Sequence, residues 1–361
     1  YRASKKRNEY ARTARAQFAS QFDFELDDFQ RAALEVVEEG RSVLVAAPTG
    51  SGKTVVGEFA LHMALRRQQR AFYTTPIKAL SNQKYLEFVA ELGSESVGLL
   101  TGDTSLNADA PVVVMTTEVA RNMIYSGTDL TDLGAVVLDE VHYLADRFRG
   151  PVWEEVIIHM PSHVQIVALS ATVSNAEEFG AWIDQVRGGC SVIVSEVRPV
   201  PLYQHMMVER KLYDLYQPTR EGGHALRGKI NPQLRHAIAR SQGIQSRSPH
   251  EAVRGLAGGR RMRGAGRRAS RVSKPQIVIS LEQAHLLPAI FFIFSRAGCE
   301  DALDAVYSAG VSFTTRQEAQ EIAAVVDEAV SSLSAEDLGV LGIARWAAAL
   351  EAGIAAHHAG M

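Results

Sequence analysis

Residues 43–54 read VLVAAPTGSGKT, an apolar run followed by a glycine-rich turn and a Lys-Thr pair. A helix-like segment follows directly. Gly50 and Gly52 let the backbone curl so that successive N–H groups point at phosphate oxygens, while Lys53 reaches the terminal phosphates and the Thr54 hydroxyl ligates Mg²⁺. The helix adds the positive end of its dipole. Because strand, turn and helix occur together, the stretch predicts a nucleoside triphosphate site rather than a chance Gly/Ser turn.

Short runs rich in β-branched residues recur along the first half of the chain, and helix-like segments lie between them. The runs are residues 42–47, 71–75, 97–100, 111–116, 135–139, 165–170 and 191–195, and the helices are 28–39, 54–67 and 79–92. Continuous apolar runs are typical of strands that are covered on both faces. The pattern therefore predicts an α/β, doubly wound domain with a parallel sheet, in which ligands bind beyond the carboxyl ends of the strands.

Composition sets the limits on further interpretation. The chain has 361 residues, enough for two domains, and its formal net charge of −3 restricts any nucleic-acid surface to a local patch. The two cysteines, Cys190 and Cys299, are far apart, which favours buried reduced thiols of a cytoplasmic protein over a disulfide or a zinc site. No apolar run approaches the ~20 residues needed to span a bilayer. Both ends look cut, so we expect a fragment of a longer polypeptide.

Changes in composition suggest four segments. We expect a basic N-terminal extension at residues 1–23, a first domain at 24–202, a linker at 203–275 and a partial second α/β unit at 276–361. The linker contains a Gly/Arg-rich stretch without acids at 254–274, which fits either a solvated disordered insertion or a basic arm that contacts phosphates.

The second unit is expected to begin with a strand at 290–294 and a helix at 298–309. Two capping boxes predict further helix starts, one formed by Thr315 and Glu318 and the other by Ser334 and Asp337.

Residues 135–142 read AVVLDEVH, an apolar strand that ends in two adjacent carboxylates. Asp139 can hold the Mg²⁺ that Thr54 also contacts, and Glu140 can orient or deprotonate the attacking water. Alone, such a pair is usually a solvated strand end. Together with the phosphate loop in one sheet, it predicts phosphoryl transfer in which Lys53, Asp139 and Glu140 are the catalytic residues.

With the tetrapeptide DEVH at 139–142 and SAT at 170–172, the chain resembles a superfamily-two helicase of the DExH type. Further matching motifs are TPIKALSNQK at 75–84, LTGD at 100–103, MTTE at 115–118, FFIFSR at 291–296 and HHAG at 357–360. The segments PVWEE at 151–155 and RPVPL at 198–202 are similar to sequences of the Ski-like branch, especially those of HelY-type actinobacterial helicases. The resemblance runs from about residue 24 to the end, apart from the basic insertion. It implies tandem RecA-like sheets of the P-loop NTPase class, the second one incomplete.

The resemblance also implies roles on the nucleotide side. Phe24 and Gln30 match the aromatic and the glutamine that recognise adenine, which favours ATP, although Phe24 could instead be a helix-entry staple. The phosphate loop corresponds to Ala47, Pro48, Thr49, Gly50, Ser51, Gly52, Lys53 and Thr54. The elements that link nucleotide state to strand movement correspond to His142, Ser170, Ala171 and Thr172, where small hydroxyl residues could otherwise simply cap a helix.

Hydroxyls, amides and lysines at strand ends make good phosphate contacts, which carry no sequence information. The candidates are Thr75, Pro76, Lys78, Asn82, Lys84, Gly102, Thr116, Thr117 and Arg121. Each alone is ordinary surface, but the set on one rim predicts contact with single-stranded or tailed duplex RNA or DNA. Few aromatics accompany it, so we expect backbone tracking rather than base stacking.

The first hypothesis is an ATP-dependent helicase that moves 3′-to-5′, a direction implied only by the resemblance. The alternatives are a duplex translocase without strand separation and a nucleotide-gated binding module. Family members carry a later arginine that stabilises the transferring phosphate, worth about three to five orders of magnitude in rate. Arg296 belongs to another motif, so we expect this fragment to bind ATP–Mg²⁺ and hydrolyse it poorly. The choice between RNA and DNA, the oligomeric state and RNA-processing protein partners stay open.

Overall fold

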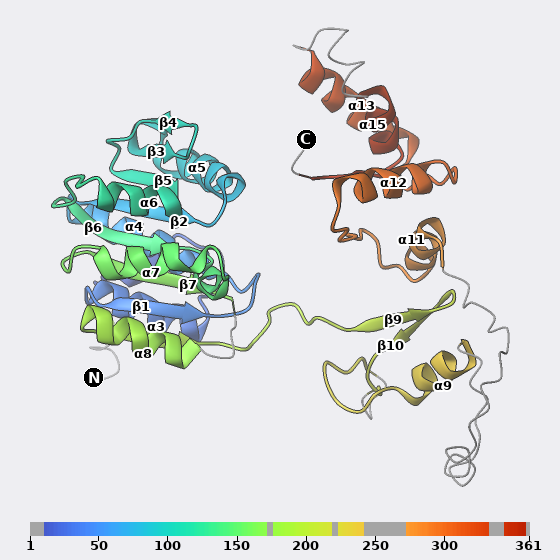
Figure 1. The fold of residues 1–361 in the computed structure, drawn as a ribbon, viewed down its shortest axis with the longest axis horizontal. Coiled ribbons are helices and arrows are strands. Elements are labelled where there is room, and N and C mark those ends of the chain that lie inside the picture. Colours follow the sequence, from blue (N-terminus) through green and yellow to red (C-terminus); the bar gives the residue numbers. More distant parts are fainter. Residues whose placement is uncertain (1–10, 172–175, 219–222, 242–271, 332–342, 359–361) are drawn as a thin grey trace. The chain divides into compact units, whose positions relative to one another are not determined.

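The computed structural model describes residues 11–171, 176–218, 223–241, 272–331 and 343–358. The chain divides between Pro201 and Leu202 into two compact units, here called unit 1 and unit 2 (Figure 1).

An eight-stranded sheet forms the centre of unit 1. Its strands are β1 Ser42–Ala46, β2 Arg70–Thr75, β3 Val97–Leu100, β4 Ser105–Leu106, β5 Val112–Thr116, β6 Leu133–Leu138, β7 Gln165–Ser170 and β8 Cys190–Val194. Their order across the sheet is β4-β3-β5-β2-β6-β7-β1-β8. Every neighbouring pair is parallel except β3 and β4, which are antiparallel. The predicted parallel α/β sheet is confirmed, with all seven expected strands in place.

Helices cover both faces of this sheet (Figure 1). They are α3 Asp28–Glu38, α4 Thr54–Arg66, α5 Lys78–Leu92, α6 Thr117–Tyr125, α7 Gly150–His159 and α8 Ala176–Arg187. Successive side chains of β1 enter opposite cores: Val43 and Val45 pack with residues of α3 and α4, and Leu44 packs with residues of α7. Because both faces are covered, every residue of β1 is buried. A two-sided burial of this kind selects the continuous apolar run seen in the sequence.

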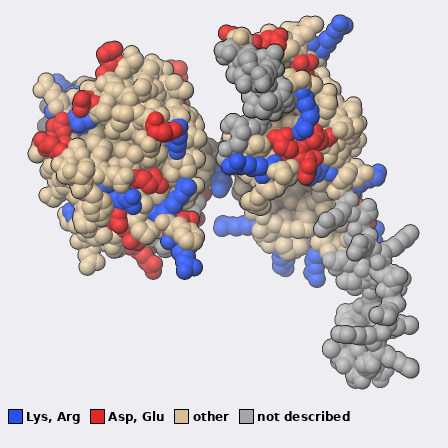
Figure 2. Space-filling model, turned by 45° about the horizontal axis from the view of Figure 1, so that its top comes forward, with Lys and Arg blue, Asp and Glu red and all other residues tan. Residues whose placement is uncertain are grey.

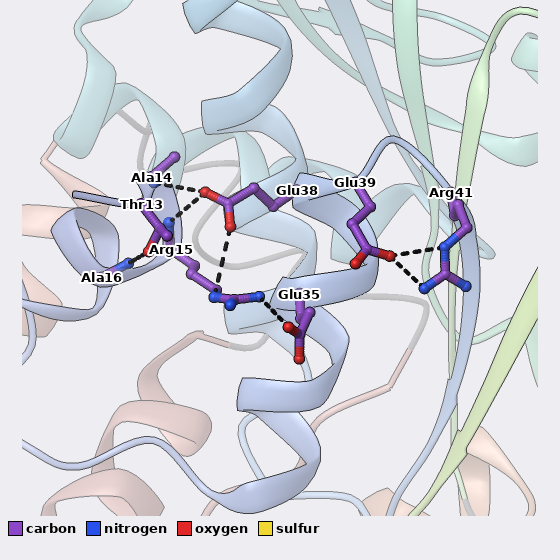
Figure 3. A network of polar contacts seen from close by, with 8 residues as sticks. All are labelled: Thr13, Ala14, Arg15, Ala16, Glu35, Glu38, Glu39 and Arg41. Atoms are coloured by element: carbon purple, nitrogen blue, oxygen red, sulfur yellow. Dashed lines mark hydrogen bonds and ion pairs between the residues drawn. The ribbon is translucent and has the colours of Figure 1, made fainter. Parts of the chain in front are cut away.

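A short helix, α2 Ala14–Ala19, precedes the sheet and lies within the segment expected as an extension. Glu38 of α3 accepts from the backbone N–H of Ala14 at 2.6 Å, and Arg15 pairs with Glu35 at 2.9 Å (Figure 3). On its other side, α2 inserts Phe18, which is 2% exposed and whose ring centroid lies 5.1 Å from that of Phe59. The described part of the N-terminal segment is therefore packed onto the core of unit 1.

Unit 2 contains a hairpin and helices among its described residues. The hairpin joins β9 His205–Val208 to β10 Lys211–Asp214, and the helices are α9 Pro232–Ser241, α11 Lys274–Gln283, α12 Arg296–Tyr307, α13 Arg316–Val330 and α15 Ile343–Glu351. Helix α9 contacts the hairpin, α11 contacts α12, and α13 contacts α15. Helix α9 lies in the segment that sequence analysis treated as a linker.

The prediction of a strand at 290–294 is wrong, because these residues do not form a strand. Ile290 is 82% exposed, Phe292 83% and Phe294 102%. The only strands in the described part of unit 2 are β9 and β10, and they pair with each other, so no described neighbour supplies the ladder of hydrogen bonds that a strand needs.

The expected helix at 298–309 is confirmed as α12. The capping box of Thr315 and Glu318 is also confirmed, with Glu318 N donating to Thr315 Oγ1 at 3.2 Å and Thr315 N to Glu318 Oε2 at 2.7 Å. The second box, at Ser334 and Asp337, lies outside the described residues, as does the basic stretch up to residue 271.

Basic and acidic side chains are interspersed over the face of unit 1 that Figure 2 shows, which agrees with a net charge near zero. Cys190 and Cys299 are free, and they are half-buried rather than fully buried as expected. In the part of the chain that is described, no helix combines the length and apolarity required to cross a membrane.

Candidate active site

The phosphate loop follows β1 and leads into α4, whose first residue is Thr54. Gly50 and Gly52 have φ angles of +81° and +77°, a left-handed region that side chains with a Cβ rarely adopt. Lys53 is 9% exposed, and its Nζ donates to the carbonyl oxygens of Ala47 at 2.9 Å and Pro48 at 3.1 Å. The loop thus closes around its own lysine while the N-terminus of α4 faces the same point.

Burial lowers the pKa of Lys53, and the negative charges of Glu140 and Asp139 partly oppose that shift. The carboxylates therefore lie close enough to act on the lysine, although they follow β6 rather than β1. The sheet order explains the proximity, because β7 pairs with both β1 and β6 and the three parallel strands end at one edge. The structure thereby brings the predicted lysine and acids together.

Gln30 joins the upstream helix to the phosphate loop. Its Nε2 donates to Gly52 O at 2.9 Å, and its Oε1 accepts from Asp27 N at 2.7 Å. A Cβ at residue 52 would lie 2.7 Å from Gln30 Nε2, so a side chain there would displace the end of Gln30 from its hydrogen bond to Gly52 O. Phe24 is 55% exposed, with its ring 5.1 Å from that of Phe22. The helix-entry staple interpretation does not hold, because the residue before the N-cap of α3 is Leu26.

Asp139 is fixed by hydrogen bonds to both of its carboxylate oxygens. Tyr73 Oη donates to Oδ2 at 2.8 Å, and Glu140 N donates to Oδ1 at 2.9 Å. Tyr73 is fully buried in β2, and burial together with the charge of Asp139 raises its pKa well above the usual value. The phenol is therefore a permanent donor. Tyr73 was missed in the sequence, where it is one of three hydroxyl residues in the strand that pairs with β6 and nothing distinguishes it from Thr74 and Thr75.

Glu140 has a φ of +51°, so the backbone turns sharply at the acid pair. Burial raises the pKa of Glu140 and the charge of Asp139 raises it further, while His142 and Lys53 oppose the shift. Its Oε2 lies 3.1 Å from His142 Nδ1, and Ala171 N donates to that same nitrogen at 3.4 Å. His142 Nδ1 can donate to Glu140 only when it carries a proton, and it can accept from Ala171 N only when it does not. The protonation of His142 Nδ1 therefore decides which of the two hydrogen bonds forms.

His142, which follows β6, and Ala171, which follows β7, therefore lie in contact. Ser170 is 1% exposed, and its Oγ has no hydrogen-bond partner among the described residues. Ser51 Oγ in the phosphate loop is likewise buried and without a partner there. Thr172 lies outside the described residues. Orphaned hydroxyls, left-handed glycines and the hard oxygens of Thr54 and Asp139 fit a triphosphate with Mg²⁺.

The predicted nucleic-acid residues separate into three groups. Thr75 and Thr117 are fully buried, and Pro76 is buried beside them. Thr75 Oγ1 donates to Ile77 O at 3.0 Å, and Thr117 Oγ1 donates to Thr75 O at 3.2 Å. These hydroxyls are already engaged in bracing the strand ends, so the prediction that their side chains contact phosphates is corrected.

The second group lies at the surface of the same rim. Lys78 is exposed and its Nζ pairs with Asp103 at 2.5 Å, next to the exposed Gly102. Asn82 is half-buried one helical turn further along α5. Arg121 Nε lies 3.7 Å from Glu155. Weak ion pairs of this kind exchange readily for phosphate contacts. Thr116, which is 9% exposed, is instead buried at the end of β5.

Lys84 forms the third group by itself. Its Nζ pairs with Glu87 at 2.5 Å, and its charge acts on Glu58 of α4. Because residues six apart lie on different faces of a helix, Lys84 points away from the face that carries Lys78. The structure does not bring Lys84 to the predicted rim.

A Gly-rich loop between a parallel strand and a helix, with an acid pair two strands away, defines a P-loop NTPase domain of the RecA-like type. Residues 27–179 match the family model described as DEAD/DEAH box helicase. The chain therefore carries a DEAD/DEAH box helicase domain at these residues.

Among curated proteins, the chain is similar to "Probable helicase HelY" of Mycobacterium leprae, 49% identical over 350 residues, which are 96% of this chain and 37% of that protein. The "Antiviral helicase SKI2" of Saccharomyces cerevisiae is 37% identical over 381 residues, 95% of this chain and 29% of that protein. The predicted Ski-like branch is thus confirmed. Among solved structures, the DUF1998 helicase MrfA bound to DNA gives a TM-score of 0.43 at 22% identity, covering 51% of this chain and 29% of the other. The chain spans 37% of the length of the HelY relative.

Proposed function

We propose that this chain is part of an ATP-dependent helicase, in which ATP hydrolysis drives 3′-to-5′ movement along a nucleic-acid strand and separates duplexes. The observation that carries the proposal is the convergence of Lys53 with Asp139 and Glu140 at one edge of a parallel sheet. The direction of movement rests on the resemblance alone.

In this proposal each residue has a definite task. Lys53 and the N–H groups of the loop bind the phosphates, and Gln30 joins adenine recognition to the loop through Gly52. Thr54 and Asp139 would hold Mg²⁺, which neutralises charge on the phosphates when it is bound. Glu140, with its raised pKa and His142 alongside, would orient the attacking water and hold its proton. The contact between His142 and Ala171 would couple the nucleotide state of the site to the end of β7.

The proposed substrate is single-stranded or tailed duplex RNA or DNA, bound along Lys78, Asn82, Gly102 and Arg121. We further propose a cytoplasmic location, since the two cysteines are free thiols, and RNA-processing partners, since a relative 37% identical is named an exosome RNA helicase.

The main experiment compares ATP turnover by the wild type and Glu140→Gln, with and without single-stranded RNA or DNA, in the full-length parent. We expect strand-stimulated hydrolysis that falls by about 10²–10⁴-fold in the variant. Nucleotide binding should persist, because Lys53 and Thr54 are unchanged, and the strand should stay bound. A wild type that binds nucleotide but never turns it over would favour the nucleotide-gated binding module instead.

A second experiment tests the rim. Lys78→Ala should weaken strand binding at every sequence and reduce the slope of log affinity against log salt by about 1. Lys84→Ala is the matched control, because it removes the same charge from the same helix on another face. Equal losses from both variants would show that only general charge matters.

A further inference from the structure

Two histidines and an aspartate converge in unit 2, outside the nucleotide site. His205 is the first residue of β9 and Asp214 the last of β10, and they are direct cross-strand partners. His224 reaches the same point from beyond the hairpin. Asp214 Oδ1 lies 2.9 Å from His205 Nδ1 and 3.0 Å from His224 Nδ1. The three ligand atoms lie within 4.8 Å of one another.

The surroundings hold these side chains in place. The two imidazole rings are 5.5 Å apart at 84°, and the ring of Tyr203 lies 5.1 Å from that of His224. Asn231, which is 7% exposed, donates to the backbone carbonyl of Asp214 at 3.1 Å. The side chains of His205 and Asp214 are 23% and 25% exposed, and that of His224 is 56% exposed. The cluster is therefore anchored on one side and open to solvent on the other.

We propose that His205, Asp214 and His224 form a zinc site. Two imidazole nitrogens aimed at one carboxylate oxygen form a donor set of net charge −1 that a divalent cation can bridge. Imidazole nitrogen favours zinc over Mg²⁺ or Ca²⁺, which take oxygen ligands. In a tetrahedral zinc site, bonds of about 2.0–2.1 Å place neighbouring ligand atoms about 3.3 Å apart. The two observed N–O distances, 2.9 Å and 3.0 Å, differ from that spacing by a few tenths of an ångström, and the two imidazole nitrogens lie within 4.8 Å of each other.

Three protein ligands leave a fourth position for water, and the exposed side of His224 provides the entry path. The bound ion would fasten residue 224 to the hairpin of unit 2. A cluster without zinc affinity would be a plain hydrogen-bonded cross-link between the same elements. This site is independent of the proposed ATP chemistry, so either can fail without the other.

The test measures zinc retained by the tag-free full chain after incubation with Zn²⁺ and dialysis, by elemental analysis. We expect one equivalent more in the wild type than in Asp214→Asn or His205→Gln, with at least about tenfold weaker affinity in the variants. His236→Gln, which removes an exposed histidine of α9, is the matched control and should retain the ion. Equal zinc in the wild type and Asp214→Asn would overturn the proposal.

A second measurement covers variants that fail to fold. Co²⁺ added to the wild type should give the strong visible absorption of a tetrahedral site, and equimolar Zn²⁺ should abolish it. Weak, octahedral-type absorption would also overturn the proposal.

Discussion

The strand β6 in unit 1 and the segment 290–294 in unit 2 are both short apolar runs, yet only one becomes a strand. Residues 133–138 are buried throughout and pair with β2 and β7. Residues 290–294 expose Ile290, Phe292 and Phe294. Both runs are apolar, but only the first has neighbours that pair with it and cover it.

A parallel strand needs hydrogen-bonding partners on its edges and helices over its faces. Unit 1 supplies both, because crossover helices return the chain to the sheet after each strand. In the described part of unit 2 the buried apolar residues are few, namely Leu234, Ala237, Leu303, Val306, Val326 and Ala349. Among the described residues, the run at 290–294 therefore has neither the pairing edges nor the covered faces that β6 has.

The largest expected effect comes from one chemical change made in both regions. Phe72 is 1% exposed in β2 and Phe292 is 83% exposed. Phe72→Ala should lower the free energy of unfolding of unit 1 by about 3–5 kcal/mol, because it leaves a cavity in a packed core. Phe292→Ala should change stability by less than about 0.5 kcal/mol.

Urea unfolding, followed by hydrogen exchange in peptides from each unit, measures both changes. A loss of several kcal/mol from Phe292→Ala would break the comparison, since it would show that 290–294 is buried in solution.

The second largest effect concerns the buried hydrogen bond from Tyr73 to Asp139 in unit 1. Tyr73→Phe removes the donor to Asp139 Oδ2 and keeps the ring that packs against Phe88. We expect nucleotide binding in Mg²⁺ to weaken about tenfold, because groups that hold metal ligands typically change metal affinity by that amount.

Calorimetric titration of ATP in Mg²⁺ and in EDTA separates this effect from misfolding, because binding in EDTA should not change. Tyr213→Phe on β10 is the matched control. Equal weakening with and without metal would assign Tyr73 a purely structural role.

The smallest effect is a pH dependence within unit 1. Burial raises the pKa of Glu58 on α4, as do the charges of Glu91 and Glu87, while Lys84 lowers it. A carboxyl whose folded pKa is raised stabilises the fold at low pH, and that contribution is lost as pH rises through the folded pKa. Glu58→Gln should therefore be more stable than the wild type at pH 7, and its advantage should shrink as pH falls.

Thermal unfolding of both proteins from pH 7 down to the ordinary carboxyl range checks the sign. An advantage that grows on acidification would mean that Glu58 is stabilised as a carboxylate, most simply by Lys84.

Sequence patterns predicted most of unit 1 and most of its nucleotide site. The seven strands, Lys53 and the acid pair were all visible, because burial on both faces and phosphate binding impose residue types at fixed local spacing. Tyr73, the bond from Gln30 to Gly52 and the packing of Phe18 were not visible. Each joins residues that are far apart in the chain, and a single tyrosine or phenylalanine has no local signature.

The nucleic-acid rim was predicted from residue type, and that was not enough. Lys78 and Lys84 have the same charge, but residues six apart lie on different faces of α5. Thr75 and Thr117 have suitable hydroxyls, but burial at the strand ends commits those hydroxyls to neighbouring carbonyls.

The amino-acid order by itself determined the phosphate loop, the alternation of strands and helices, and the family to which residues 27–179 belong. Only the tertiary structure decided that β1, β7 and β6 lie side by side, that Tyr73 holds Asp139, and that His205, Asp214 and His224 meet. The physical reason is the distance along the chain over which each factor acts. Turn chemistry and hydrophobic periodicity act over a few residues. Strand order and side-chain convergence depend on which distant segments the folded chain packs together.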